Sequence, residues 1–127
     1  MNPTEVGELL PRVREIALSF PGAQEKLSHG SPTWFTKKVF AMYGAHVKGD
    51  HDSDLLDHSV VFMPDTDERE ALLQDGRFHV PGYWGPFGWL ALNLTDGDVD
   101  WDEVTELIDA SYRNTAGVRL IQQLDSR

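Results

Sequence analysis

The feature that most constrains the fold is a series of short strand-like segments that no helical pattern interrupts. The segments span residues 33–36, 39–43 and 59–63, and they are rich in aromatic and β-branched side chains. Consecutive strands without a helix between them favour antiparallel pairing, because a parallel pair needs a long crossover connection that is usually a helix. The central part of the chain therefore predicts an antiparallel sheet.

A helical pattern precedes these strands. Between Val6 and Phe20 the apolar residues recur at the spacing of an amphipathic helix. Pro11 lies inside this stripe, where a proline removes one backbone hydrogen bond and clashes with the preceding turn. Either the helix is kinked at Pro11, or it begins near Leu10 with the proline in its first turn. The proline-glycine pair that follows Phe20 ends the helix in both cases.

Two more helices are expected in the second half of the chain, each preceded by an acidic cap. Asp65 precedes a helix over residues 66–74, and Asp100 precedes a third helix with Tyr112 on its apolar side. In both places a glutamate stands three residues after the aspartate, which is the spacing of a capping box. We therefore expect both aspartates to cap their helices.

A further strand is expected at residues 90–94, where leucine alternates with alanine and asparagine, so that the leucines share one face. With the glycine- and proline-rich segment before it, the predicted order of elements is α-β-β-β-α-β-β-α. This order indicates a single α+β domain over residues 1–127, in which an antiparallel sheet has helices packed on one face.

The composition excludes several classes of function. The chain has no cysteine, which excludes thiol catalysis, cysteine-based zinc sites and disulfides. No apolar run reaches the ~18–20 residues that cross a bilayer, and the charged residues of the first segment do not fit a signal peptide. We therefore expect a soluble cytoplasmic protein with no membrane partner and no cofactor.

Charge is distributed unevenly along the chain. The formal net charge is −10, yet residues 26–49 contain four lysines and no acidic residue, so that window carries +4 and the rest sums to −14. These lysines are Lys26, Lys37, Lys38 and Lys48. They either solvate the sheet and its turns or form a patch that faces an anion such as nucleic-acid phosphate.

One cluster of histidine and carboxylate side chains has the composition of a metal site. It consists of His51, Asp52, Asp54, Asp57 and His58. Metal ligands are held by rigid elements and by further hydrogen-bond partners, whereas this cluster lies in a predicted exposed loop. It also lacks the spacing that places two ligands on one helix face. We predict that it binds no metal.

Two segments are candidates for a ligand site. His29 lies in the segment LSHGSP, where it either hydrogen-bonds a turn or lines a site. The segment VPGYWGPFGW places Tyr83, Trp84 and Phe87 among glycines and prolines that turn the backbone sharply. These rings either plug one end of the sheet or stack on a base or a planar ligand. We recognise no nucleophile elbow or oxyanion hole, and we predict no catalytic residue.

Three segments together resemble the MmcQ/YjbR-like family. They are SFPGAQEKLSHGSPTWFTKKVFAMY (19–43), PGYWGPFGWLALNL (81–94) and DWDEVTELIDASYR (100–113). The resemblance covers roughly residues 5–124 in the family's order. The matching residues are His29, Gly30 and Pro32 in a His-Gly-x-Pro segment, Lys38, Phe40 and Ala41 in a Lys-x-Phe-Ala strand, and Gly88 and Trp89 in a Gly-Trp strand.

This resemblance implies an α+β fold of the frataxin-like or double-wing kind and a DNA-binding function, with no catalytic residues. The chain departs from the family in two places. Residues 116–119 carry one positive charge where many members have a basic turn, and the segment KGDHDSDLLDH at 48–58 resembles an acidic insertion. Both departures weaken the attraction to nucleic acid.

Two hypotheses use different surfaces. In the first, a non-enzymatic binding module holds DNA phosphates with the four lysines, and Trp34 supplies a stacking or groove contact. In the second, the HGSP segment at His29 and the GYWGPFGW segment at residues 82–89 line a pocket for a small molecule or a protein partner. The resemblance and the local charge favour DNA, whereas the net charge favours the pocket.

Overall fold

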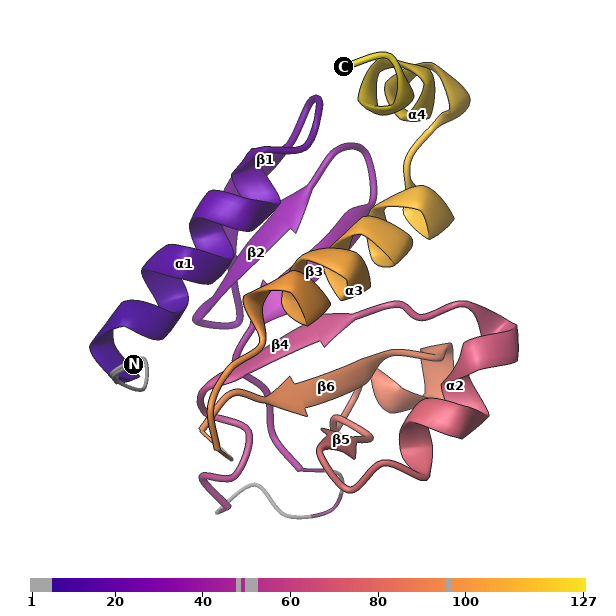
Figure 1. Cartoon of the computed structure of the whole chain (residues 1–127). Coiled ribbons are helices and arrows are strands. Elements are labelled where there is room, and N and C mark those ends of the chain that lie inside the picture. The colour runs from indigo at the N-terminus through magenta and orange to yellow at the C-terminus, as the bar shows by residue number, and fades with distance from the viewer. Residues whose placement is uncertain (1–5, 48, 50–52, 96) are drawn as a thin grey trace.

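The structure, a computed structural model, describes residues 6–47, 49, 53–95 and 97–127. In these ranges six strands form one sheet in the order β1-β2-β3-β4-β6-β5, and every neighbouring pair is antiparallel (Figure 1). The strands are β1 (Gln24–Ser28), β2 (Ser31–Phe35), β3 (Val39–Tyr43), β4 (Ser59–Phe62), β5 (Phe78–His79) and β6 (Leu90–Asn93). The helices are α1 (Val6–Leu18), α2 (Thr66–Leu73), the single-turn helix η1 (Gly85–Phe87), α3 (Trp101–Thr115) and α4 (Val118–Asp125). The predicted α+β class is confirmed.

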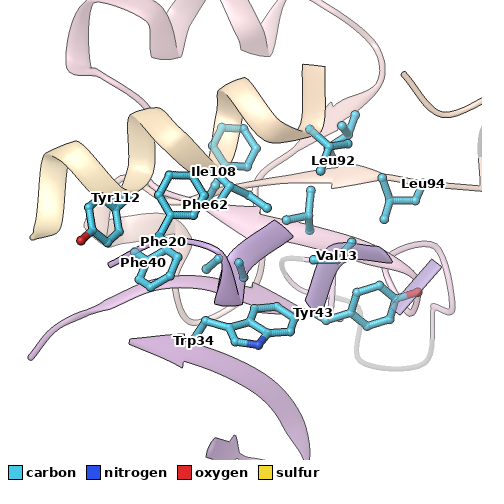
Figure 2. Packing of buried hydrophobic residues seen from close by; sticks show 14 of the residues in the cluster. Val13, Phe20, Trp34, Phe40, Tyr43, Phe62, Leu92, Leu94, Ile108 and Tyr112 are labelled. Atoms are coloured by element: carbon cyan, nitrogen blue, oxygen red, sulfur yellow. The ribbon is translucent and has the colours of Figure 1, made fainter. Parts of the chain in front are cut away.

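Helices α1 and α3 lie side by side on one face of the sheet (Figure 1). They bury Val13 and Ile108 against the strands, and the rings of Trp34, Phe40 and Tyr112 belong to the same core (Figure 2). The rings of Phe40 and Tyr112 pack edge to face with their centroids 5.2 Å apart. Apolar burial of this kind stabilises the fold by ~25 cal/mol per Å² of buried surface. The predicted packing of helices on one face is confirmed.

Loops cover the opposite face of the sheet. Met42, Val61 and Ala91 come from three neighbouring strands and pack with Leu56 and Trp89 in a second, smaller cluster of buried residues. The leucines of β6 instead belong to the helix-side core, as their alternation predicts. The loops on this second face therefore pack on a buried apolar cluster that is separate from the helix-side core. The same loops form walls of the candidate site.

Strand β1 is missing from the predicted order. Its sequence is QEKLS, and four of its five residues are exposed. It is an edge strand, so it buries little surface and lacks the apolar alternation by which strands are recognised. Because Ser28 pairs with Ser31, β1 and β2 form a hairpin whose turn consists of two residues.

The N-terminal helix decides between the two alternatives at Pro11, a helix that continues through the proline and a helix that begins near Leu10. Helix α1 begins at Val6 and continues through Pro11, so a start near Leu10 is wrong. The proline removes one backbone hydrogen bond, while Leu9 and Val13 on either side of it remain buried in the core. Burial of the apolar stripe therefore outweighs the local cost of the proline.

The two predicted caps have different outcomes. The Asp100 carboxylate accepts hydrogen bonds from the amides of Asp102 and Glu103 at 3.1 and 3.2 Å, which confirms the cap of α3. Asp65 is exposed and makes no side-chain bond to α2, so that part of the prediction is wrong. At α2 it is the Asp65 carbonyl oxygen that accepts, from the amides of Glu68 and Arg69 at 3.0 and 3.1 Å.

Candidate ligand pocket

A pocket of about 670 Å³ lies at one end of the sheet. Its walls come from four places in the sequence: the β1–β2 turn, the end of β3 with the segment that follows it, the loop before β4, and residues 80–88, which we call the aromatic loop. The lining residues include Ser28, His29, Ser31, Tyr43, His46, Asp57, Tyr83 and Trp84. The fold thus joins the HGSP and GYWGPFGW segments in one site.

The β1–β2 turn contributes His29 to the pocket. His29 and its neighbour Gly30 both have positive φ, 53° and 81°, as a type I′ turn requires. Glycine adopts this conformation freely, whereas a residue with a Cβ atom does so at a cost of roughly 1–2 kcal/mol. The hairpin therefore carries backbone strain at the residue that lines the pocket.

The aromatic loop holds Tyr83 in an equally unusual conformation. Tyr83 has a φ of 68°, and across it the Trp84 amide donates a hydrogen bond to the Gly82 carbonyl at 2.7 Å. This combination is that of the γ-turn with a positive central φ, which is rare and strained. The Gly85 amide donates to the Pro81 carbonyl at 2.9 Å and closes the next turn of the loop.

Three aromatic rings meet at the pocket. Tyr83 is 72% exposed, and its ring centroid lies 6.3 Å from that of the His29 ring. Its centroid is 5.0 Å from that of Trp84, and the two rings are nearly perpendicular, with an interplanar angle of 83°. Trp84 is half-buried, and its ring packs on Trp89 of the loop-side cluster at 5.9 Å. The rings of the pocket therefore have support from the core.

Main-chain hydrogen bonds fix the wall that follows β3. The Gly44 amide donates to the Ser59 carbonyl at 2.9 Å, and the His46 carbonyl accepts from the Gly82 amide at 2.7 Å. Gly44 has a φ of +87°, and a Cβ atom there would come within 3.2 Å of the Asp57 carbonyl oxygen. The wall is therefore bonded both to β4 and to the aromatic loop, and it depends on a glycine.

Tyr43 lines the pocket from β3, while its ring belongs to the helix-side core. Its oxygen lies 3.0 Å from Nδ1 of His58. Burial raises the pKa of Tyr43 to about 12, because the charged phenolate is disfavoured away from water. The phenol therefore stays protonated at neutral pH.

The structure brings together three of the four residues predicted to bind a ligand. His29, Tyr83 and Trp84 line the pocket. Phe87 is not a lining residue, so the prediction that it lies in the pocket is corrected: it lies in η1 and is 64% exposed. Its ring centroid is 6.4 Å from that of Tyr83, which places it beside the pocket rather than in it.

Sequence reasoning missed the contributions of Tyr43, His46 and Asp57. These residues reach the site only through the pairing of β3 with β4 and through the loop between them. A signal for the hairpin was present, because histidine is one of the few residues other than glycine that tolerate a positive φ. A His-Gly pair between two serines thus fits a two-residue turn.

Two lysines lie in the turn at the other end of the same hairpin. Lys37 and Lys38 are exposed in the β2–β3 turn. Lys26 is exposed in β1, with its Nζ atom 4.8 Å from the centroid of the Phe35 ring. Lys48 lies outside the described residues. Three lysines are therefore placed on β1 and the β2–β3 turn, and none of them lines the pocket.

Trp34 cannot make the contact predicted for it. Its side chain is fully buried beneath α1, and its Nε1 donates to the Glu25 carboxylate at 2.7 Å (Figure 2). Arg14 also donates to this carboxylate, at 2.8 Å, and its hydrogen bond lowers the pKa of Glu25. A ring with no exposed surface cannot stack on a base, so the assignment of Trp34 to a nucleic-acid interface is wrong.

Neither a grouped set of metal ligands nor a membrane-spanning helix occurs among the described residues. No three His, Asp or Glu side chains of the described residues are grouped so as to hold a metal ion. Of the predicted metal-free cluster, His51 and Asp52 lie outside the described residues, so that prediction remains untested. No helix in the described ranges is both long and apolar enough to cross a membrane.

A family model described as YjbR matches residues 18–114. The chain belongs to the YjbR family. The matched region contains all six strands and every residue that lines the pocket, so the site is built from the part of the chain that YjbR proteins share. The resemblance found in the sequence is confirmed.

A solved structure agrees with this assignment. It is the crystal structure of Deinococcus radiodurans protein DR2400, described by the domain name DUF419. The two chains are 18% identical, the match covers 81% of this chain and 75% of that one, and the TM-score is 0.61. At this identity the likeness shows the fold alone. The comparison with curated proteins gave no match.

Proposed function

We propose that this YjbR-family chain is a non-enzymatic protein that binds a small molecule in the pocket between the β1–β2 turn and the aromatic loop. One observation carries the proposal. His29 and Tyr83 are the two non-glycine residues with positive φ in the described chain, and both line this pocket. Left-handed backbone at such residues costs of order 1–3 kcal/mol each, and it clusters at ligand clamps and active sites.

The size and the lining of the pocket support the same function. A volume of about 670 Å³ falls within the ~300–1,000 Å³ range of pockets that hold small ligands. Aromatic residues line the pocket beside Ser28 and Ser31, which is the usual mixture of apolar surface with a few polar groups. The main-chain bonds of the walls favour a site that is formed before the ligand arrives.

One observation favours DNA as a second candidate ligand. The described lysines, Lys26, Lys37 and Lys38, form no ion pair with any described residue, so their charges are available to phosphate. The net charge of −10 opposes the approach of the rest of a duplex. Binding at this end is therefore expected to be weak and sensitive to salt.

Amide NMR of isotope-labelled protein, titrated with a set of small-molecule fragments, tests the proposal. We expect fragments to shift the resonances of residues 28–31, 43–46 and 82–84. Tyr83→Asn should weaken these responses, because it removes the ring while asparagine tolerates the positive φ. Phe87→Ala is the matched control, since it removes an exposed ring outside the pocket and should leave the responses unchanged.

Two results would contradict the proposal. One is a fragment set that shifts no pocket resonance in a protein whose spectrum is that of the folded state. The other is a set of responses confined to residues 36–38, which would assign binding to the lysine end of the hairpin instead.

A further inference from the structure

The charges around the pocket are unequal. Among the described residues that line it, Asp57 is the one carboxylate, none is lysine or arginine, and two are histidines, His29 and His46. The described lysines lie on β1 and in the β2–β3 turn and do not line the pocket. An anionic ligand would find no lysine or arginine to pair with among the described lining residues. The lining therefore disfavours phosphates and carboxylates.

Four of the main-chain amides at the pocket are not available to an anion. The amides of Gly44, Gly82 and Trp84 already donate to carbonyl oxygens, at 2.9, 2.7 and 2.7 Å. The Ala45 amide does the same to Leu56 at 2.9 Å. Phosphate and oxyanion sites need several N–H groups that point at the ligand without a partner. These four residues line the pocket, yet their amides are committed to the fold.

The aromatic walls favour the opposite charge. The rings of Tyr83 and Trp84 stand at 83° to each other with their centroids 5.0 Å apart, and they form a corner. The face of an aromatic ring carries partial negative charge, and cations bind within ~6 Å of its centroid. Asp57 adds a full negative charge to the same lining, and the net charge of −10 attracts cations to the molecule as a whole.

We propose that the ligand of this pocket is an organic cation with a substituted ammonium group, an inference that rests on the proposed binding function. The apolar substituents on the nitrogen pack in the corner between Tyr83 and Trp84, where the ring faces also stabilise the charge. Asp57 provides the counter-charge. The remainder of the ligand occupies the rest of the pocket, because about 670 Å³ exceeds the volume of such a head group.

Three probes of the same shape and different charge test the inference. They are choline, the neutral alcohol in which carbon replaces the choline nitrogen, and the carboxylate tert-butylacetate. Each is titrated into the labelled full-length protein, and the shifts of residues 28–31 and 82–84 give the dissociation constant. We expect choline to bind about tenfold more tightly than the neutral alcohol, and the carboxylate to bind not at all.

Variants locate the effect in the pocket. Tyr83→Asn should reduce choline affinity about tenfold, because it removes one wall of the corner and keeps the turn. Asp57→Asn should reduce it about fivefold and leave the neutral alcohol unaffected. Asp54→Asn is the matched control, since it removes one exposed charge from the same loop outside the pocket lining. It should leave choline affinity unchanged.

The outcomes separate this inference from the proposed function. If the neutral or the anionic probe binds as tightly as choline, the inference of a cationic ligand is wrong, while the proposed small-molecule site is still supported. If none of the three probes binds but other fragments shift the pocket resonances, the inference of a cationic ligand is again wrong, and the proposed binding function is still supported. If no fragment and no probe shifts those resonances, both fail.

Discussion

The two ends of the β1–β2 hairpin are built differently. At one end, His29 and Gly30 turn the chain in two residues with positive φ, beside a wall that main-chain hydrogen bonds hold in place. At the other end, residues 36–38 connect β2 to β3 after a register shift between Trp34 and Phe35, and the turn lysines face solvent. One end is a pocket with strained, supported walls, and the other is a solvated, charged turn.

This difference separates selective from unselective binding. Fixed walls and oriented rings discriminate between ligands by shape and charge. Exposed lysines attract phosphate but read no sequence, since sequence is read by contacts to base edges. The aromatic residue expected to add such a contact, Trp34, is buried beneath α1. Selectivity is therefore expected at the pocket end.

The largest expected effect concerns the support of the pocket. Trp89 is buried in the loop-side cluster, and Trp84 packs on it. Trp89→Ala should lower the free energy of unfolding by ~3–5 kcal/mol, and Trp84→Ala by about half as much, because Trp84 is half-buried. Denaturant unfolding of both variants measures the difference. Equal losses would make the aromatic loop part of the core and remove its separate role as a wall.

The next effect tests the lysine end. If Lys26, Lys37 and Lys38 each neutralise one phosphate, the slope of log affinity against log salt is about −2.7, at ~0.9 per phosphate. Raising salt from ~50 to ~200 mM should then weaken duplex binding about 40-fold. Fluorescence anisotropy with a labelled duplex measures both quantities. Affinity that does not change with salt would exclude the lysine turn as the contact.

A charge-reversal variant completes this test. Lys37→Glu combined with Lys38→Glu should abolish duplex binding and change the free energy of unfolding by less than ~0.5 kcal/mol, because both side chains are exposed. Arg119→Glu on α4 is the control for a change in net charge elsewhere on the surface. Duplex binding that survives the double reversal would move the interface away from this turn.

Sequence patterns identified the elements that bury the most surface. The stripes of α1 and α3 and the alternation in β6 were readable because core contacts dictate those residues. Strand β1 was not readable, since an edge strand with exposed polar residues carries no such pattern. Trp34 was assigned to the surface because composition alone does not say which face of a strand the helices cover.

The pocket was readable in part for a related reason. Glycine and proline spacing marked the aromatic loop as a turn, and His29 stood in a segment with no evident core role. The contributions of Tyr43 and Asp57 depend on how β3 pairs with β4 and on the path of the loop between them. Those are non-local contacts, and no spacing along the chain encodes them.

A third prediction concerns alkaline pH and the buried Tyr43. Its pKa is raised to about 12 in the folded chain, against an ordinary value near 10. The unfolded state therefore loses its proton first, so the stability due to this group is present below about pH 10 and is lost as pH rises towards 12. Between about pH 9 and pH 11 the loss should be about 1 kcal/mol.

Tyr43→Phe isolates that effect. The variant keeps the ring and removes both the titrating group and the contact with His58, so it should be less stable at neutral pH and decline less steeply in alkali. Some decline should remain, because burial also raises the pKa of Tyr112. Denaturant unfolding at several alkaline pH values measures the slopes. Identical slopes for the two proteins would contradict the assignment of the raised pKa to Tyr43.

The smallest expected change in stability distinguishes a turn residue from a ligand residue. Asn-Gly is a preferred pair in two-residue type I′ turns, and asparagine tolerates positive φ well. His29→Asn should therefore raise the free energy of unfolding by about 0.5 kcal/mol, measured by thermal or denaturant unfolding. Gly30→Ala is the opposite control: its φ is 81° and a Cβ atom would meet nothing within 4 Å, so it should destabilise by ~1 kcal/mol through backbone strain alone.

Ligand binding decides what the same variant means. His29→Asn removes the ring that lies 6.3 Å from Tyr83, so fragment responses at residues 82–84 should weaken even as the protein becomes more stable. A variant that is destabilised would show that the imidazole supports the fold. A variant that is stabilised and still binds fragments normally would remove His29 from the site. Only a gain in stability together with a loss of binding indicates that the strained histidine contributes to ligand binding. The reason is that asparagine fits the turn better than histidine does.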